Sequence, residues 1–183
     1  MTLNTPKWMR WLLVAPLLLM PAVAGMSAEI APETIKATYI LQMRSFIKIG
    51  ASKKSINSVC YYESKDVPFE DSVGQQIEKY ARGHPAENLS VKKFTAVRDF
   101  SSCDALYIPS EEQNNIDNIL AALRTAQVLS ISGSSKFILR GGMIGFIVDE
   151  DNHVKMEANM KNLQSKNINV DAGLLEIMAR VIN

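Results

Sequence analysis

The pattern of apolar and polar residues is most regular between residues 140 and 159, where it predicts two strands joined by a tight turn. In the first arm, residues 143–148, apolar side chains point to both faces, which is typical of a strand covered on both sides. In the second arm, residues 154–160, apolar and polar residues alternate, which is typical of an edge strand with one wet face. The turn is supplied by Asp149 to Asn152. Gly141 and Gly142 enter the hairpin, where paired glycines permit backbone angles that other residues avoid.

Four other stretches have the apolar spacing of amphipathic helices: residues 33–50, 72–82, 110–123 and 171–182. Ser72 with Gln75, and Ser110 with Gln113, have the spacing of a capping box, and Asp171 is a candidate cap of the last helix. In the first helix the positions expected to face the core are Ile35, Tyr39, Met43, Phe46 and Ile47, with Lys36, Arg44 and Lys48 on other faces. In the last helix they are Leu174, Leu175, Met178, Val181 and Ile182.

Short runs rich in β-branched and aromatic residues predict strands at residues 56–62, 89–96, 104–108 and 127–132. Strand, helix, strand, strand, helix, strand is an α/β order, and right-handed crossovers make such strands mostly parallel. We therefore expect one three-layer α/β domain. Its sheet is mostly parallel, with an antiparallel hairpin at one edge and helices on both faces.

Residues 1–24 have the three parts of a secretory signal peptide. Lys7 and Arg10 form the charged start, residues 11–20 an apolar run, and residues 21–24 a small-x-small ending. Cleavage after residue 24, or as late as residue 28, leaves a domain at 29–183. The apolar run is shorter than the ~20 residues of a spanning helix, so we expect no stable membrane insertion after cleavage. An uncleaved anchor is the alternative.

The charge of the mature chain argues against nucleic acid as a partner. The leader holds two of the 20 basic residues and none of the 19 acidic ones, so the mature chain is close to neutral. No basic cluster forms the footprint of a nucleic-acid-binding protein. The leader also holds both tryptophans, Trp8 and Trp11, so the mature chain contains none.

The sequence lacks the motifs of common catalytic and metal sites: no Gly-x-Ser-x-Gly elbow, no His-Glu-x-x-His, no phosphate loop and no Cys-x-x-Cys. The loop at residues 63–70 has no glycine, which counts against a dinucleotide cofactor at that turn. The acidic pair at 111–112 and the hairpin tip at 149–151 are expected to be solvated, and His84 and His153 to lie on the surface. We therefore expect no enzyme, no cofactor and no metal.

Cys60 and Cys103 both lie in the mature part of the chain. In an oxidising compartment two cysteines usually pair, and the closed loop of about 44 residues is worth roughly 4 kcal/mol in the chain-entropy model. Two buried free thiols are the alternative.

The predicted fold favours a ligand pocket over a catalytic site. Open α/β sheets bind ligands outside the carboxyl ends of their strands. Ordinary polar loops are the alternative at each position. The residues at the predicted strand ends are Glu63, Lys65, Asp66, Ser110, Ser132 and Arg140.

The chain resembles the YfiR family of periplasmic regulatory proteins over residues 33–182. The resemblance is carried by Gly141-Gly142-Met-Ile-x-Phe146, the hairpin that follows, Asn159, and the Gly-Leu-Leu at 173–175. Cys60, at a strand, and the run from Cys103 to Ser110 also fit the family pattern. Two features depart from it. Gly133 stands where the family has Asp after Ser, and the family's Trp-Pro is missing after residues 46–48.

The resemblance implies a non-enzymatic periplasmic protein that binds the periplasmic domain of an inner-membrane diguanylate cyclase and restrains it. Such members set cyclic di-GMP, biofilm formation and attachment, and redox state modulates them through disulfides. A second copy of the chain is a further candidate partner. The alternative is an envelope ligand-binding or accessory protein on the same fold, with no cyclase partner.

Overall fold

The computed structural model describes residues 30–63, 72–97 and 100–183. The α-helices are α1 Pro32–Met43, α2 Val73–Gly83, α3 Ile116–Ala122, α4 Met160–Ser165 and α5 Ala172–Glu176, and the 3-10 turns are η2 Pro85–Glu87, η3 Ser110–Asn114 and η4 Phe137–Arg140. The strands are β1 Ile47–Ile49, β2 Lys54–Ser55, β3 Ser58–Tyr62, β4 Ser90–Phe94, β5 Ala105–Ile108, β6 Leu129–Ser132, β7 Ile144–Val148, β8 Val154–Asn159, β9 Ile168–Val170 and β10 Arg180–Ile182.

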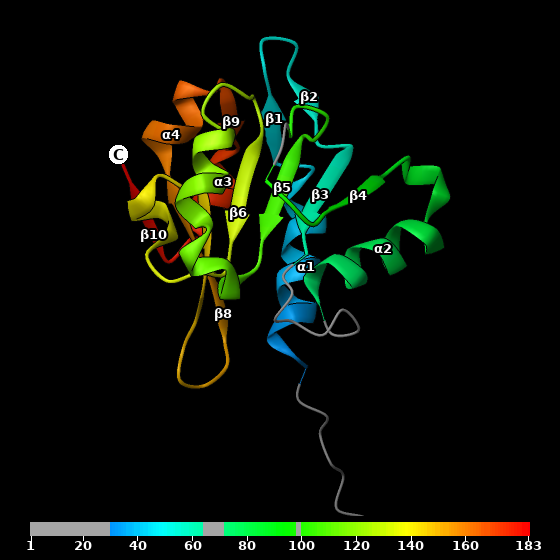
Figure 1. Ribbon diagram of the computed structural model, residues 1–183, viewed down its shortest axis with the longest axis horizontal. Coiled ribbons are helices and arrows are strands. Elements are labelled where there is room, and N and C mark those ends of the chain that lie inside the picture. The colour runs from blue at the N-terminus through cyan, green and yellow to red at the C-terminus, as the bar shows by residue number, and fades with distance from the viewer. Residues whose placement is uncertain (1–29, 64–71, 98–99) are drawn as a thin grey trace, which may run out of the picture.

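Seven strands form the main sheet in the order β10-β8-β7-β6-β5-β3-β4, and β2-β1-β9 form a small second sheet (Figure 1). The pairs β4–β3, β3–β5, β5–β6 and β6–β7 are parallel, and β7–β8 is antiparallel. Helices lie on both faces of the main sheet. The three-layer, mostly parallel α/β domain expected from the sequence is thus confirmed.

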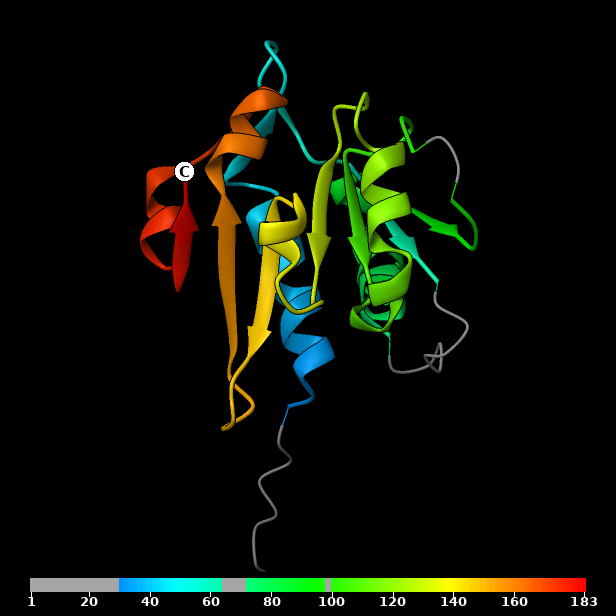
Figure 2. The same cartoon turned by 60° about the vertical axis from the view of Figure 1, so that its left-hand side comes forward.

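The direction in which the chain winds reverses between β3 and β5. From β3 the chain passes through α2 to β4 on one side, and from β5 through α3 to β6 on the other. The arrows of β5, β6 and β7 all point downward in Figure 2, so their carboxyl ends share one edge of the sheet. Such a reversal leaves a crevice outside the carboxyl ends of the two central strands, because the helices that follow them diverge.

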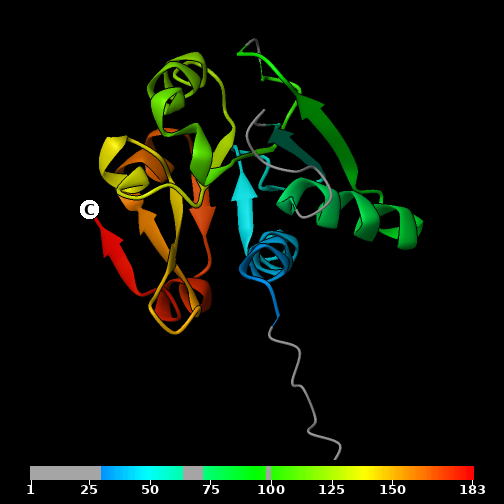
Figure 3. The ribbon, with the colours of Figure 1, turned by 60° about the horizontal axis from the view of Figure 1, so that its bottom comes forward.

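The sheet separates two apolar cores. In Figure 3 α3 lies on one side of it, and α1 and α2 lie on the other. Along β3, Val59 and Tyr61 pack into the core under α1 and α2, whereas Cys60 and Tyr62 pack into the core under α3. Period-two alternation with both faces apolar is what a central parallel strand requires.

The first helix is shorter than the sequence predicts. It ends at Met43, and residues 47–49 form β1, which pairs with β9. The predicted burial also needs correction, because Phe46 is 47% exposed and Lys36 is only 4% exposed. α1 packs against α2 as well as the main sheet, so the face that it buries is broader than the predicted stripe and includes a charged position.

The last helix is also shorter than predicted. Asp171 does cap it, accepting a hydrogen bond from the Gly173 amide at 2.9 Å, but α5 ends at Glu176 and residues 180–182 form β10. β10 pairs in parallel with β8, so β8 is not the edge strand. Its predicted wet face is therefore partly covered: Glu157 is 2% exposed and forms an ion pair with Arg180.

The two glycines at 141 and 142 meet different constraints. Gly141 has a φ of 102°, a left-handed conformation that glycine adopts at little cost. Gly142 is not in that region. There the constraint is steric, because a Cβ atom would lie 2.2 Å from a ring carbon of the buried Phe137 side chain. The expectation of unusual backbone angles thus holds for Gly141 only.

Replacing Gly142 by valine should lower the free energy of unfolding by about 1 to 3 kcal/mol, because the added side chain overlaps the Phe137 ring in a packed core. Urea unfolding of the purified mature protein measures the change. The matched control is Gly83→Ala, since no atom lies within 4 Å of a Cβ built at Gly83. Its midpoint should be unchanged or higher. An unchanged midpoint for Gly142→Val would contradict the steric argument.

Candidate functional site

A pocket of about 220 Å³ opens at the carboxyl ends of β3 and β5. Its lining combines aromatic rings, hydroxyl groups and carboxylates with the first turn of α2. The lining residues are Glu33, Tyr61, Tyr62, Ser72, Val73, Gly74, Tyr107, Pro109, Ser110 and Glu111. The pocket therefore lies where the winding reverses, in the position that a doubly wound sheet offers to ligands.

One wall of the pocket is formed by the Tyr61 ring, which lies on the backbone of α2. A Cβ at Gly74 would be 2.4 Å from the ring, so only glycine permits this approach. The Tyr61 hydroxyl donates a hydrogen bond to Glu78 at 3.0 Å. Burial, followed by this bond to a carboxylate, raises the pKa of Tyr61. Ser72 caps α2 by accepting a hydrogen bond from the Gln75 amide at 3.1 Å, as the sequence predicts.

Tyr107 is, like Tyr61, a deeply buried tyrosine of the lining, with 4% of its surface exposed. Among the described residues its hydroxyl has no hydrogen-bond partner. Burial, and then the negative charges of Glu111 and Glu33, raise the pKa of Tyr107. Sequence reasoning missed this residue, although a tyrosine in a strand that is otherwise Ala-Leu-Ile was a signal.

Lys36 lies behind the pocket mouth, at the carboxyl ends of β5 and β6. Its ammonium group is 3.3 Å from a Glu33 carboxylate oxygen. A Cβ at Gly133 would lie 3.4 Å from Lys36 Nζ and 3.7 Å from Ser110 Cβ, so these three residues converge. A buried cation requires such a partner, because an isolated charge is costly to desolvate.

The structure separates the six residues predicted to form a pocket. Ser110 lines the pocket but does not cap the following helix, which begins with the 3-10 turn η3 instead. Glu63 directly follows β3 and pairs with Lys93 at 3.2 Å. Ser132 is buried and accepts a hydrogen bond from the Ser134 amide at 3.0 Å. Lys65 and Asp66 lie outside the described residues.

Arg140 does not belong to this pocket. Its guanidinium group is 2.9 Å from a carboxylate oxygen of Asp117, and it donates a hydrogen bond to the Gln113 carbonyl at 3.0 Å. Arg140 therefore ties η4 to the η3–α3 segment. It lines a different depression, of about 450 Å³, together with Asn162 and Lys166.

Cys60 and Cys103 form a disulfide, with their Cα atoms 5.8 Å apart. This confirms the predicted pairing. Cys60 lies in the middle of β3, and Cys103 lies two residues before the first residue of the neighbouring strand β5. Both residues are buried in the core under α3, at 0% and 3% exposure. The bond therefore joins the two central strands at the end of β5 that is opposite the pocket.

Asp104 reinforces the same junction. Its carboxylate accepts hydrogen bonds from the amides of Asn57 and Ser58, at 2.9 and 2.8 Å, and from the Lys54 ammonium at 2.9 Å. Burial by itself raises the pKa of Asp104, but the bond from Lys54 and then those from the two amides outweigh it and lower the pKa below its usual value. The start of β3 is thus held to the start of β5 by charge-assisted bonds.

The remaining motif residues have structural contacts. The Phe146 ring stacks on Tyr39 with ring centroids 6.2 Å apart, which joins β7 to α1. Asn159 caps α4 by accepting a hydrogen bond from the Asn162 amide at 3.0 Å. Its side-chain amide donates to the Ile138 carbonyl at 2.9 Å. Asn159 therefore fixes η4 against the hairpin.

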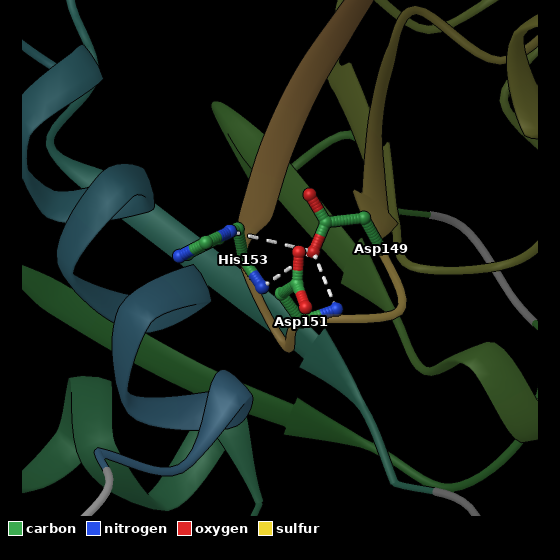
Figure 4. A group of neighbouring side chains, drawn as sticks. All are labelled: Asp149, Asp151 and His153. Carbon is green, nitrogen blue, oxygen red and sulfur yellow. Dashed lines mark hydrogen bonds and ion pairs between the residues drawn. The ribbon is translucent and has the colours of Figure 1, made fainter.

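The hairpin tip gathers Asp149, Asp151 and His153 (Figure 4), whose ligand atoms lie within 4.8 Å of one another. Asp149 accepts bonds from the amides of Asp151 and His153 at 3.1 and 2.9 Å, and it pairs with Lys155 at 2.9 Å. The bond from Lys155, followed by that from the His153 amide, lowers the pKa of Asp149 to about 2. Through these contacts the Asp149 carboxylate holds the hairpin turn closed, so its role in the described structure is a structural one.

The fold and the crevice together define a doubly wound α/β domain of the kind that binds ligands outside the carboxyl ends of its strands. The chain belongs to the YfiR/HmsC-like family, whose model matches residues 33–179. This is a family of periplasmic regulatory proteins. No curated protein matches the chain. None of the helices within the described ranges has the length and apolar content of a membrane span.

Three solved structures share the fold at low sequence identity. A conserved domain protein from Vibrio cholerae O1 biovar El Tor has a TM-score of 0.63 at 10% identity, covering 84% of this chain and 61% of its own. An ABC domain in complex with L-Trp from Streptococcus pneumoniae has a TM-score of 0.57 at 13% identity. The match covers 83% of this chain and 61% of that one. The ligand-free, open form of a substrate-binding protein with adhesive properties from Clostridium difficile has a TM-score of 0.53 at 10% identity. The match covers 81% of this chain and 59% of that one. The chain thus spans about three fifths of each.

Removing the disulfide should destabilise the protein. The double variant Cys60→Ala, Cys103→Ala should lose about 2 to 4 kcal/mol of unfolding free energy, because the open chain regains the entropy of a 43-residue separation. Urea unfolding with and without dithiothreitol measures this loss. The wild type should lose stability on reduction, whereas the variant should not respond. Equal midpoints for wild type and variant would contradict the stabilising role.

The Asp104 contacts should make stability depend on pH. The pKa of Asp104 is lower in the folded protein than in the unfolded chain, so its contribution is complete above about pH 4 and is lost as pH falls through the folded value. At pH 7, Asp104→Asn should cost about 1 to 3 kcal/mol. The difference from wild type should shrink as urea unfolding is repeated toward pH 3. Asp151→Asn, at the exposed hairpin tip, is the matched control and should change little.

Proposed function

We propose that the protein is a non-enzymatic periplasmic regulator that restrains an inner-membrane diguanylate cyclase by binding the cyclase's periplasmic domain. Restraint lowers cyclic di-GMP and, with it, biofilm formation. The observation that carries this proposal is the family match over residues 33–179, in a chain that retains the disulfide and the double-glycine hairpin. The leader at residues 1–24 is cut in this proposal, leaving the domain at 29–183 in the periplasm.

The chemistry of the described residues supports a binding role over a catalytic one. Histidine is the side chain best suited to proton transfer near neutral pH. His84 is exposed and stacks on Tyr80 with centroids 4.1 Å apart, and the His153 side chain is 72% exposed at the hairpin tip. Two of the better-buried carboxylates, those of Asp104 and Glu157, are held in ion pairs that join strands. These histidines and carboxylates therefore make structural contacts or lie on the surface, and the pocket is the feature that remains for binding.

The free edge of the main sheet is the surface that best suits a protein partner. β10 is the last strand at that edge, and its outer side has no neighbour among the described strands. Two apolar side chains are exposed at this edge: Ile177 at 66% and Val181 at 38%. An unpaired strand with apolar side chains around it is a template for another chain, because its backbone groups and its apolar surface both lack partners. We therefore place the cyclase contact at β10 and the end of α5.

Charge placed at this edge should release the cyclase. Ile177→Glu and Val181→Glu should each weaken capture of the cyclase from solubilised membranes about tenfold or more, because a carboxylate must lose its hydration in the interface. Cells that carry either variant in place of the wild type should have raised cyclic di-GMP. Val97→Glu is the matched control, since Val97 is 37% exposed and follows β4, the strand at the opposite edge of the main sheet from β10.

The outcome of the capture experiment separates the two candidate functions. Recovery of a membrane protein with a cytoplasmic cyclase domain, lost with the edge variants only, supports the regulator. If wild type and variants restrain cyclic di-GMP equally, the edge is not the contact. If no membrane protein is recovered and the purified protein carries a small molecule, the function is that of an envelope ligand-binding protein. The pocket between β3 and β5 is the observation that favours this second function.

A further inference from the structure

The pocket at the carboxyl ends of β3 and β5 contains two polar groups that have no partner in the described part of the chain. Among the described residues, neither the Tyr107 hydroxyl nor the Glu111 carboxylate has a hydrogen bond or an ion pair. Glu111 is exposed at the mouth, whereas Tyr107 is 96% buried, as follows from its 4% exposure. The two groups are electrostatically coupled, since the charge of Glu111 is one of the causes that raise the pKa of Tyr107.

Tyr107 is the stronger of these two observations. Although the residue as a whole is buried, its hydroxyl oxygen is not enclosed: Ser134 Oγ is the one fully enclosed side-chain atom without a hydrogen-bond partner among the described residues. A phenylalanine would fill the same position in β5 without presenting a hydroxyl group to the pocket. The hydroxyl lines a cavity of about 220 Å³, which is large enough for a small molecule and not only for water. Because the hydroxyl is accessible and has no protein partner among the described residues, its hydrogen-bond partner is water or a ligand in the cavity.

The charges around the pocket decide which kind of molecule fits. Among the described residues, the lining contains two carboxylates, Glu33 and Glu111, and no cationic side chain. Lys36 lies outside the lining and neutralises Glu33 from behind, at 3.3 Å. The amino-terminal end of α2 contributes only about half a positive charge. One of its free amides, that of Gln75, already donates a hydrogen bond to the Ser72 hydroxyl. The charge left unbalanced at the mouth is the carboxylate of Glu111.

The walls are aromatic. Tyr61, Tyr62 and Tyr107 all line the pocket, and the Tyr61 ring is held in place by its contact with Gly74 and its bond to Glu78. Aromatic rings beside a carboxylate form a site that attracts organic cations, because both the ring faces and the carboxylate are negative. A rigid wall also lowers the entropic cost of binding.

We propose that this pocket binds a small organic ammonium compound. Its ammonium group pairs with Glu111 and reaches the Tyr107 hydroxyl, and its apolar body lies against the tyrosine rings. The site differs from the β10 edge to which the cyclase contact is assigned. It does not depend on the proposed function, because binding is measured on the isolated mature protein. The volume limits the ligand to roughly a dozen non-hydrogen atoms.

Three probes of nearly equal size and different charge test the proposal: benzylammonium, benzyl alcohol and benzoate. Each is titrated into the mature protein, and the tyrosine ring signals are followed by NMR. Benzylammonium should bind in the millimolar range and about tenfold more tightly than benzyl alcohol, as one charge-assisted hydrogen bond requires. Benzoate should bind most weakly. The signals of Tyr61, Tyr62 and Tyr107 should shift, whereas Tyr39 and Tyr80, outside the pocket lining, should not.

Two variants locate the binding. Tyr107→Phe removes only the hydroxyl and should weaken benzylammonium binding about 3- to 10-fold, while its melting temperature stays equal to the wild type's or rises. Glu111→Gln removes the exposed charge and should weaken binding to a similar extent. The matched control is Glu150→Gln, which makes the same change of charge at the hairpin tip and should leave binding unchanged.

Three results would overturn the proposal. Binding that is equal for the three probes would show that charge plays no part. Benzylammonium binding that is unaffected by Tyr107→Phe and Glu111→Gln would place it elsewhere on the protein. Absence of any tyrosine shift up to about 20 mM benzylammonium would mean that the cavity holds only water. None of these results bears on capture of the cyclase, so failure here and failure of the regulator proposal are distinguishable.

Discussion

The pairing of β3 with β5 at the centre of the main sheet is the contact on which the rest of the structure depends. It is a parallel pairing, so its two strands are distant in sequence and their association is costly in chain entropy. The protein reinforces it at one end with two further contacts. The Cys60–Cys103 disulfide joins the strands covalently, and the Asp104 carboxylate holds the amides at the start of β3.

The opposite end of the same pair is left open. There the chain leaves β3 and β5 in opposite directions, and the pocket lies between the two exits. A four-residue strand such as β5 is only about 13 Å long, so the reinforced end and the open end are close together. The stability invested near Cys103 therefore positions the Tyr107 ring and the Ser110 loop directly. The two cross-links therefore lie at one end of the β3–β5 pair, and the pocket lies at the other.

Much of the architecture could be predicted from the sequence because it rests on local pattern. The α/β order, the parallel strands, the hairpin and the Ser72 and Asp171 caps all follow from periodicity and short-range hydrogen bonding. The disulfide followed from compartment and cysteine count. The candidate pocket was only partly predictable. The rule that ligands bind at strand ends pointed correctly to the carboxyl ends of the central strands and to Ser110. It could not predict that Arg140 turns toward Asp117.

The sequence by itself determined the fold class, because burial of alternating and helical apolar faces is a property of local spacing. Only the tertiary structure decided the identity of the three-residue segments 47–49 and 180–182, since such short strands exist only through the partners that they pair with. It also decided that Lys36 is buried and that Gly142 is required by the Phe137 ring. The same holds for Tyr107. A tyrosine in a buried strand is unremarkable in sequence, and only the assembled sheet shows that this one lines a cavity and that its hydroxyl has no hydrogen-bond partner within the described part of the chain.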